Sequence, residues 1–186
     1  MPHSKRLIFP RSILYSSARR IENVVNAKHY HADITLIDLE DSVPILEKNS
    51  SRQFTAHLFN QGICTPHRSA LRINPLNNAD GFRDVNMLLD LHHKPDFVFL
   101  TMVETDDEII RLRQCFNDIG WYPQIYATIE TIPALEHVFD LAACLEGMIL
   151  GSADLCATLG VDINPDTLSY ARLKMKHASA KHNIAC

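Results

Sequence analysis

Two acidic side chains follow consecutive apolar runs of this sequence. Glu130 ends the run 126–129, and Asp154 follows the run 148–151. Strands of a parallel sheet are buried on both faces and therefore read as continuous apolar runs. Neighbouring strands lie about 4.8 Å apart, so carboxylates at two adjacent strand ends can share one cation. Mg²⁺ is typically held by one or two carboxylates together with water and substrate oxygens. We therefore predict a Mg²⁺ site at Glu130 and Asp154, with Mn²⁺ as the alternative ion.

A structural role for the same two residues stays open. Each carboxylate could cap the helix that follows it, because Asp154 precedes a short helical turn and Glu130 stands just before Pro133. Gly151 favours the ligand site, since a residue without Cβ lets the backbone approach a bound group closely.

Arg72 follows another apolar run, in the sequence Arg-Ile-Asn-Pro at 72–75. A guanidinium group is planar and can bind a carboxylate or an enolate oxygen with two parallel N–H groups. The alternative is a structural ion pair at the mouth of the fold. We expect Arg72 to act in both catalysis and substrate binding.

The segment 38–42 carries three carboxylates within four residues. Strand alternation puts Asp38 and Glu40 on one face, where their charges repel unless cations offset them. Arg11, in the first expected strand, could supply such a charge. We expect Asp38 to be a catalytic residue, and Glu40 and Arg11 to bind substrate. Alternatively, Asp41 with Ser42 caps a helix.

The elements that must position these residues alternate along the chain. Strands are expected at 11–16, 33–39, 68–73, from Pro95 onward, 124–129 and 148–151, and a seventh begins at 183–186. Helices are expected at 18–30, 45–60, 80–92, 106–119, 132–144 and 165–182. Such alternation predicts an α/β fold with a parallel sheet. A (β/α)₈ barrel needs eight strands and typically about 250 residues. We therefore expect residues 1–186 to form a single partial TIM-barrel domain with six βα units plus a fragment, or else an open sheet.

Composition excludes several classes of protein. The 186 residues are 46% apolar and 22% charged, which is typical of soluble proteins, and a net charge of -4 provides no basic field for nucleic acid. No apolar run is long enough to span a membrane, and the basic start fails as a signal peptide because Pro10 and Arg11 interrupt the apolar stretch. Five Cys without C-x-x-C spacing indicate reduced thiols and a cytoplasmic location.

Six motifs in order along the chain resemble the citrate lyase β-subunit-like proteins, which belong to the HpcH/HpaI aldolase group of the phosphoenolpyruvate–pyruvate barrel superfamily. The motifs are Arg-Ser-x-Leu at 11–14, Leu-Ile-Asp-Leu-Glu-Asp-Ser-Val at 36–43, Arg-Ile-Asn at 72–74, Ile-Glu-Thr at 129–131, Gly-Ser-Ala-Asp-Leu at 151–155 and Leu-Gly at 159–160. The resemblance implies a (β/α)₈ barrel of the TIM type and Mg²⁺-dependent cleavage or formation of carbon–carbon bonds. Substrates would be 3-hydroxyacyl thioesters of the citryl- or malyl-CoA kind, with coenzyme A or an acyl carrier protein as the carrier.

The same resemblance assigns roles to individual residues. Glu130 and Asp154 match the metal ligands of the family, and Arg72 matches the arginine that binds substrate and enolate. Arg11 and Asp38 match residues at the floor of the site. Association into homo-oligomers or with other subunits is expected, because the family's C-terminal third carries a lid with a catalytic acid that serves a neighbouring subunit.

Three departures from the family pattern bear on function. The first strand continues as Tyr-Ser-Ser-Ala-Arg-Arg at 15–20 in place of an apolar-Pro-Gly turn that shapes the thioester site. The fourth strand ends Thr-Met-Val-Glu at 101–104, where the family has Pro-Lys-Val-Glu. The family's last strands and lid also have no counterpart in these 186 residues. The alternatives to a lyase are therefore a noncatalytic or partner-dependent member and a related thioester hydrolase.

Overall fold

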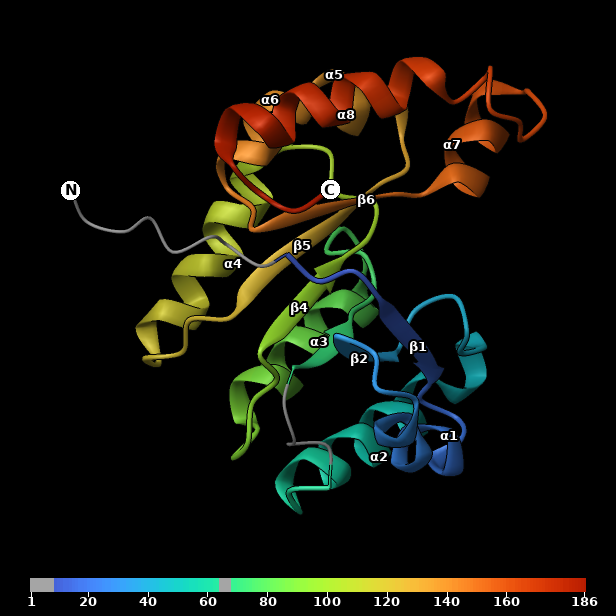
Figure 1. The fold of residues 1–186 in the computed structure, drawn as a ribbon. Helices are drawn as coiled ribbons and strands as arrows, with labels where there is room; N and C mark the ends of the chain where they lie inside the picture. Colours follow the sequence, from blue (N-terminus) through green and yellow to red (C-terminus); the bar gives the residue numbers. More distant parts are fainter. Residues whose placement is uncertain (1–8, 64–67) are drawn as a thin grey trace.

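The computed structural model of the protein describes residues 9–63 and 68–186. The described residues form a six-stranded parallel sheet in which the strands follow sequence order (Figure 1). The strands are β1 (Ile13–Ser17), β2 (Ile34–Asp38), β3 (Ser69–Arg72), β4 (Phe97–Leu100), β5 (Gln124–Ile129) and β6 (Gly147–Leu150). The sheet is curled into a half-barrel. It is the incomplete (β/α)₈ barrel that the sequence predicted.

Helices connect each strand to the next and cover one face of the sheet. The α-helices are α1 (Ile21–Asn26), α2 (Lys48–Asn60), α3 (Ala79–Asp90), α4 (Asp106–Asp118), α5 (Ile132–Glu136), α6 (Val138–Ala143), α7 (Ser152–Leu159) and α8 (Ser169–His182). Two 3₁₀ helices, η1 (Ala27–Tyr30) and η2 (Ile45–Glu47), flank α1 and α2. Among the residues described, no helix is long and apolar enough to cross a membrane.

Both faces of the sheet are buried, which explains the continuous apolar runs. The outer face packs against the helices through residues such as Leu71, Val98 and Ile125. The other face, which we call the inner face, forms a separate cluster made mainly of strand residues. Its buried members are Ile34, Leu36, Ala70, Phe97, Phe99, Tyr126 and Ala185, with Ile13 and Ile149 packed against them. Alternation along each strand therefore decides which side chains point inward.

The structure corrects three element predictions. The helix expected at 132–144 is divided into α5 and α6 at His137, whose Nδ1 lies 3.1 Å from the carbonyl oxygen of Glu104. The helix expected from 165 begins at Ser169, because the side chain of Asn164 accepts hydrogen bonds from the backbone N–H groups of residues 166 and 167 and forms a turn there. The short turn expected after Asp154 is the eight-residue helix α7, and Asp154 lies inside it.

The expected seventh strand is present only as a single parallel bridge. Ala185 pairs with Gly147 of β6, and the N–H of Met148 donates to the Ala185 carbonyl at 3.0 Å. Asn183, with φ 55°, ends α8 and turns the chain toward β6. The segment therefore lies where the next strand of the barrel was predicted.

Candidate functional site

Arg72 is bound in a two-pronged ion pair at the carboxyl end of β3. The strand register places it directly beside Asp38 of β2. Its Nε and Nη2 donate to the two carboxylate oxygens of Asp38 at 2.7 and 2.8 Å. Burial alone would raise the pKa of Asp38, but the hydrogen bonds and the charge of Arg72 hold it below its ordinary value. The ion pair that the sequence left as an alternative is therefore real.

Two further carboxylates surround the same guanidinium group. Nη1 of Arg72 lies 3.1 Å from Oε2 of Glu40 and 3.8 Å from Oδ2 of Asp41. Burial raises the pKa of Glu40 to about 7; the charge of Arg72 opposes this shift and that of Asp41 adds to it. The predicted acidic cluster is thus assembled around Arg72, which offsets its charge.

The segment after β2 forms a turn, and no described helix begins with a cap from Asp41 or Ser42. The N–H of Ser42 donates to Asp38 at 3.1 Å, and the residue before η2 is Pro44, which provides no side-chain cap. Lys48 of α2 fixes the turn, because its ammonium group donates to the carbonyl oxygens of Leu39 and Glu40 at 2.9 and 2.7 Å.

A buried network ties the ends of β2 and β3 together. Asp84 of α3 is fully buried and accepts hydrogen bonds from the backbone N–H and the side-chain amide of Asn74 at 2.8 and 2.6 Å. Asn74 also donates to the Leu39 carbonyl at 3.1 Å, and Arg52 donates to Asp84 at 2.7 Å. This network holds the backbone beside Arg72 in place.

Glu130 follows β5 at the same carboxyl edge and is only 4% exposed. Its Oε1 accepts a hydrogen bond from the backbone N–H of Met102 at 2.8 Å. Met102 has φ 51°, and this left-handed turn after β4 directs its N–H toward Glu130. Burial raises the pKa of Glu130; the Met102 hydrogen bond opposes the shift, and the negative charge of Asp154 increases it.

The start of α7 packs directly against Glu130. A Cβ atom added to Gly151 would lie 2.5 Å from Cβ and 2.8 Å from Oε2 of Glu130, so only glycine fits at this contact. Asp154 lies in the first turn of α7, within electrostatic reach of Glu130. Neither carboxylate is a helix cap, because Thr131 caps α5 with its side chain and Gly151, the residue before α7, provides no side-chain cap.

The residues at this edge fit a Mg²⁺ ion that takes most of its ligands from water and substrate. The described residues contain no group of three or more His, Cys, Asp or Glu side chains arranged around a metal. Mg²⁺ does not need one, because one or two carboxylates suffice. The negative charge of Asp154 adds to the raised pKa of Glu130, and a divalent cation beside Glu130 would oppose that shift.

Arg11 does not lie at this site, contrary to our prediction. β1 begins only at Ile13, so Arg11 precedes the strand and sits at the amino edge of the sheet. Its side chain is 91% exposed and lies 3.9 Å from Asp33. Six residues of extended chain separate it from Ser17, a distance of about 20 Å. Arg11 therefore pairs with the start of β2 and is remote from Arg72.

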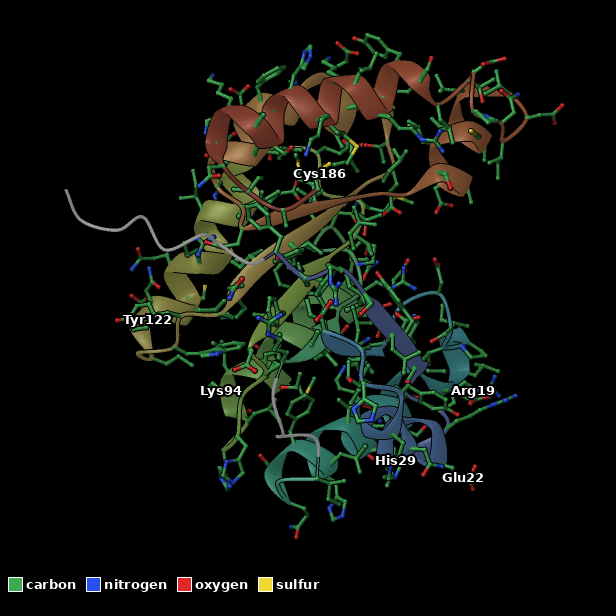
Figure 2. All side chains as sticks on the ribbon, viewed as in Figure 1. Arg19, Glu22, His29, Lys94, Tyr122 and Cys186 are labelled. Atoms are coloured by element: carbon green, nitrogen blue, oxygen red, sulfur yellow. The ribbon has the colours of Figure 1, made fainter. Side chains whose placement is uncertain are left out.

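The amino edge carries a cavity of its own. Pro10, beside Arg11, lines a space of about 430 Å³ together with Lys94, Trp121 and Tyr122. Figure 2 shows Lys94 and Tyr122 at this edge, whereas Arg19, just after the carboxyl end of β1, lies on the other side of the molecule. The acidic cluster and Glu130 belong to that other, carboxyl edge.

Tyr15 is a member of the site that sequence reasoning did not single out. The centroid of its ring lies 5.3 Å from the guanidinium carbon of Arg72. The sequence could have indicated this, because side chains two residues apart on a strand point to the same face. Tyr15 therefore shares a face with Ile13, which packs against the cluster on the inner face.

The comparison with protein families decides the classification. The family described as HpcH/HpaI aldolase/citrate lyase matches residues 11–186. The chain belongs to this family. Among its curated members, the chain is 25% identical over 186 residues to the citrate lyase subunit beta of Escherichia coli strain K12, covering 94% of this chain and 61% of the relative. It is 26% identical over 162 residues to a (3S)-malyl-CoA thioesterase of Cereibacter sphaeroides, covering 86% and 54%.

Solved structures of other proteins share the fold. RipC from Yersinia pestis is 30% identical, with a TM-score of 0.75 over 95% of this chain and 74% of that chain. The citrate lyase beta subunit of Mycobacterium tuberculosis, complexed with oxaloacetate and magnesium, is 25% identical, with a TM-score of 0.81 over 96% and 78%. The chain spans about three fifths of the length of the curated citrate lyase subunits that it matches.

Proposed function

We propose that this protein is a Mg²⁺-dependent carbon–carbon lyase acting on a 3-hydroxyacyl thioester of the citryl- or malyl-CoA type. The observation that carries the proposal is that the buried carboxylate of Glu130 lies within electrostatic reach of both Asp154 and Arg72 at the carboxyl edge of the sheet. The M. tuberculosis relative complexed with oxaloacetate and magnesium supports it, as does the family to which the chain belongs.

Cleavage breaks the bond between the hydroxyl-bearing carbon and the α-carbon of the thioester. Solvent water accepts the hydroxyl proton, an oxo acid forms, and the electron pair of the broken bond stays on the acyl thioester as an enolate, which then takes up a proton from solvent. Mg²⁺ held by Glu130 and Asp154 would polarise the oxygen atoms of the oxo acid as a Lewis acid. The N–H groups of Arg72 that Asp38 does not engage would bind the developing negative charge. Asp38 acts by fixing the plane of that guanidinium group.

A thioester hydrolase is the second candidate function. The relatives of this chain named (3S)-malyl-CoA thioesterase favour it, because they share the sequence region that contains the candidate site. A noncatalytic or partner-dependent member is the third candidate. In all three cases we propose coenzyme A, or an equivalent acyl carrier, as the group that presents the substrate.

The products of one incubation distinguish these candidates. With Mg²⁺ and malyl-CoA, a lyase releases glyoxylate and acetyl-CoA, whereas a hydrolase adds water and releases free coenzyme A and malate. The proposal predicts the first pair of products, and their loss in Glu130→Gln. Free coenzyme A with malate would establish the hydrolase. No turnover of malyl-CoA or citryl-CoA would contradict the lyase and leave the noncatalytic role.

A further inference from the structure

We propose that the hydroxyl group of Tyr15 is a substrate-binding donor that contacts an anionic oxygen of the oxo acid beside Arg72. This inference rests on the proposed function above. Tyr15 would then be a specificity-determining residue, which selects ligands with a carboxylate or enolate oxygen on the β1 side of the site.

The strand register brings Tyr15 to the inner face. Tyr15 pairs with Leu36 of β2, which belongs to the inner cluster, and partners in register on parallel strands point the same way. Arg72 is on the same face, since it lies two residues after Ala70 of that cluster. The ring of Tyr15 then lies against the guanidinium group of Arg72, with 5.3 Å between the ring centroid and the guanidinium carbon. A cation over an aromatic ring is attracted by the electron-rich face of the ring, which fixes the ring in place.

The hydroxyl group at the end of this ring is available. Within the part of the chain that the structure describes, no hydrogen bond to the Tyr15 hydroxyl is found, and the residue is 42% exposed. Its pKa is raised by burial; the charge of Arg72 opposes the shift, and the charges of Asp38, Glu130 and Glu40 add to it. The ring is placed beside the acidic cluster by its contact with Arg72, and the raised pKa keeps the phenol a neutral donor around neutral pH.

Charge balance explains why a neutral donor is useful at this place. The positive charge of Arg72 is already offset by Asp38 and Glu40, which lie 2.7 and 3.1 Å away. An anionic ligand arriving there meets more carboxylates than cations. A hydroxyl donor binds an anionic oxygen without adding charge, and a hydrogen bond to a charged group is stronger than one between neutral groups.

The test uses Tyr15→Phe, which removes only the hydroxyl and keeps the ring on Arg72. Calorimetry with Mg²⁺ and oxaloacetate should show affinity for oxaloacetate lowered about tenfold or more, in proportion to that hydrogen bond. The thermal midpoint of the ligand-free protein and the affinity for Mg²⁺ alone should not change. Tyr122→Phe is the matched control, because Tyr122 lies at the opposite edge and is 75% exposed.

A second variant separates the ring from the hydroxyl. Tyr15→Leu removes both and should weaken oxaloacetate binding more than Tyr15→Phe does. A loss in Tyr15→Leu with wild-type affinity in Tyr15→Phe would overturn the inference, because the ring alone would then position Arg72. If the wild-type protein itself binds no oxaloacetate with Mg²⁺, the proposed function fails and the role of Tyr15 fails with it.

Discussion

Arg72 is the residue on which the anion chemistry of this site depends. Its two-pronged contact with Asp38 uses one edge of the guanidinium group, and Glu40 faces another nitrogen. A lysine can supply the charge but cannot donate in two parallel directions. A substitution that keeps the positive charge but changes the geometry of the group therefore tests the role of Arg72.

Arg72→Lys should weaken binding of oxaloacetate with Mg²⁺ on the order of tenfold to a hundredfold, because a lysine held by Asp38 keeps the charge but lacks the further planar N–H groups that would bind the ligand. Far-UV circular dichroism should confirm that the fold is kept. Wild-type affinity in this variant would mean that Arg72 serves only as the structural partner of Asp38.

Glu40 should make stability depend on pH near neutrality. Its pKa is about 7 in the folded protein and near 4.5 when unperturbed, so the folded state binds this proton more tightly. The resulting stabilisation is present in full below about pH 4.5 and is lost as pH rises to about 7. Urea unfolding at pH 5 and pH 7.5 should therefore show a smaller difference in Glu40→Gln than in the wild type. An equal difference would show that Glu40 titrates normally.

The sequence predicted the position of some site residues correctly and of others wrongly. Glu130, Arg72 and Asp38 were assigned to the ends of apolar runs, and the structure gathers them because parallel strands share one carboxyl edge. Arg11 was assigned to the same edge but lies at the other one, because it stands at the start of the first strand, whether that strand begins at residue 11 as expected or at Ile13 as observed. The left-handed turn at Met102 could not be predicted, because a non-glycine residue gives no local sign of positive φ.

At the scale of elements, the contact between the start of α7 and the end of β5 sets the candidate metal site. Only Gly151 lets the two segments approach closely enough for Asp154 to act on Glu130. The sequence predicted that Gly151 lets the backbone approach a bound ligand, whereas in the structure the close approach is to Glu130. The sequence also did not indicate that Asp154 lies within a helix.

Gly151→Ala should weaken Mg²⁺ binding by about tenfold or more, because the new Cβ displaces Glu130 or the start of α7. Isothermal calorimetry measures this affinity. The matched control is Gly120→Ala, where φ is +71° and nothing lies within 4 Å of the added atom. That variant should lower stability by roughly 1 kcal/mol through backbone strain and leave Mg²⁺ affinity unchanged. Equal affinities in both variants would contradict the close packing at Glu130.

At the scale of the whole molecule, the half-barrel leaves strand edges to be covered. In the described structure β1 pairs only with β2, and β6 has a single bridge on its other side. Strand edges with free N–H and C=O groups are templates for pairing with further strands or other chains. The alternation of strands and helices predicted this architecture, because each βα unit produces a pattern within a short stretch of sequence. The partner that covers a sheet edge produces no such local pattern.

We expect this strand edge to be covered, either by association with further subunits or copies or by further strands of a longer chain, so residues 1–186 taken alone should associate in solution. Light scattering at micromolar concentration should therefore give a mass above 21.1 kDa. A stable species of monomer mass across a tenfold concentration range would contradict this expectation.

The central claim is that Glu130 and Asp154 together bind one divalent cation, and that the oxygen atoms of an oxo acid complete its coordination shell. Calorimetric titration of Mg²⁺ in the presence of oxaloacetate tests it most directly, comparing the wild type with Glu130→Gln and Asp154→Asn. Both substitutions keep shape and remove charge, so the account predicts binding in the wild type and its loss in each variant. Tyr122→Phe should bind as the wild type does. Unchanged Mg²⁺ and oxaloacetate binding in both carboxylate variants would contradict the account.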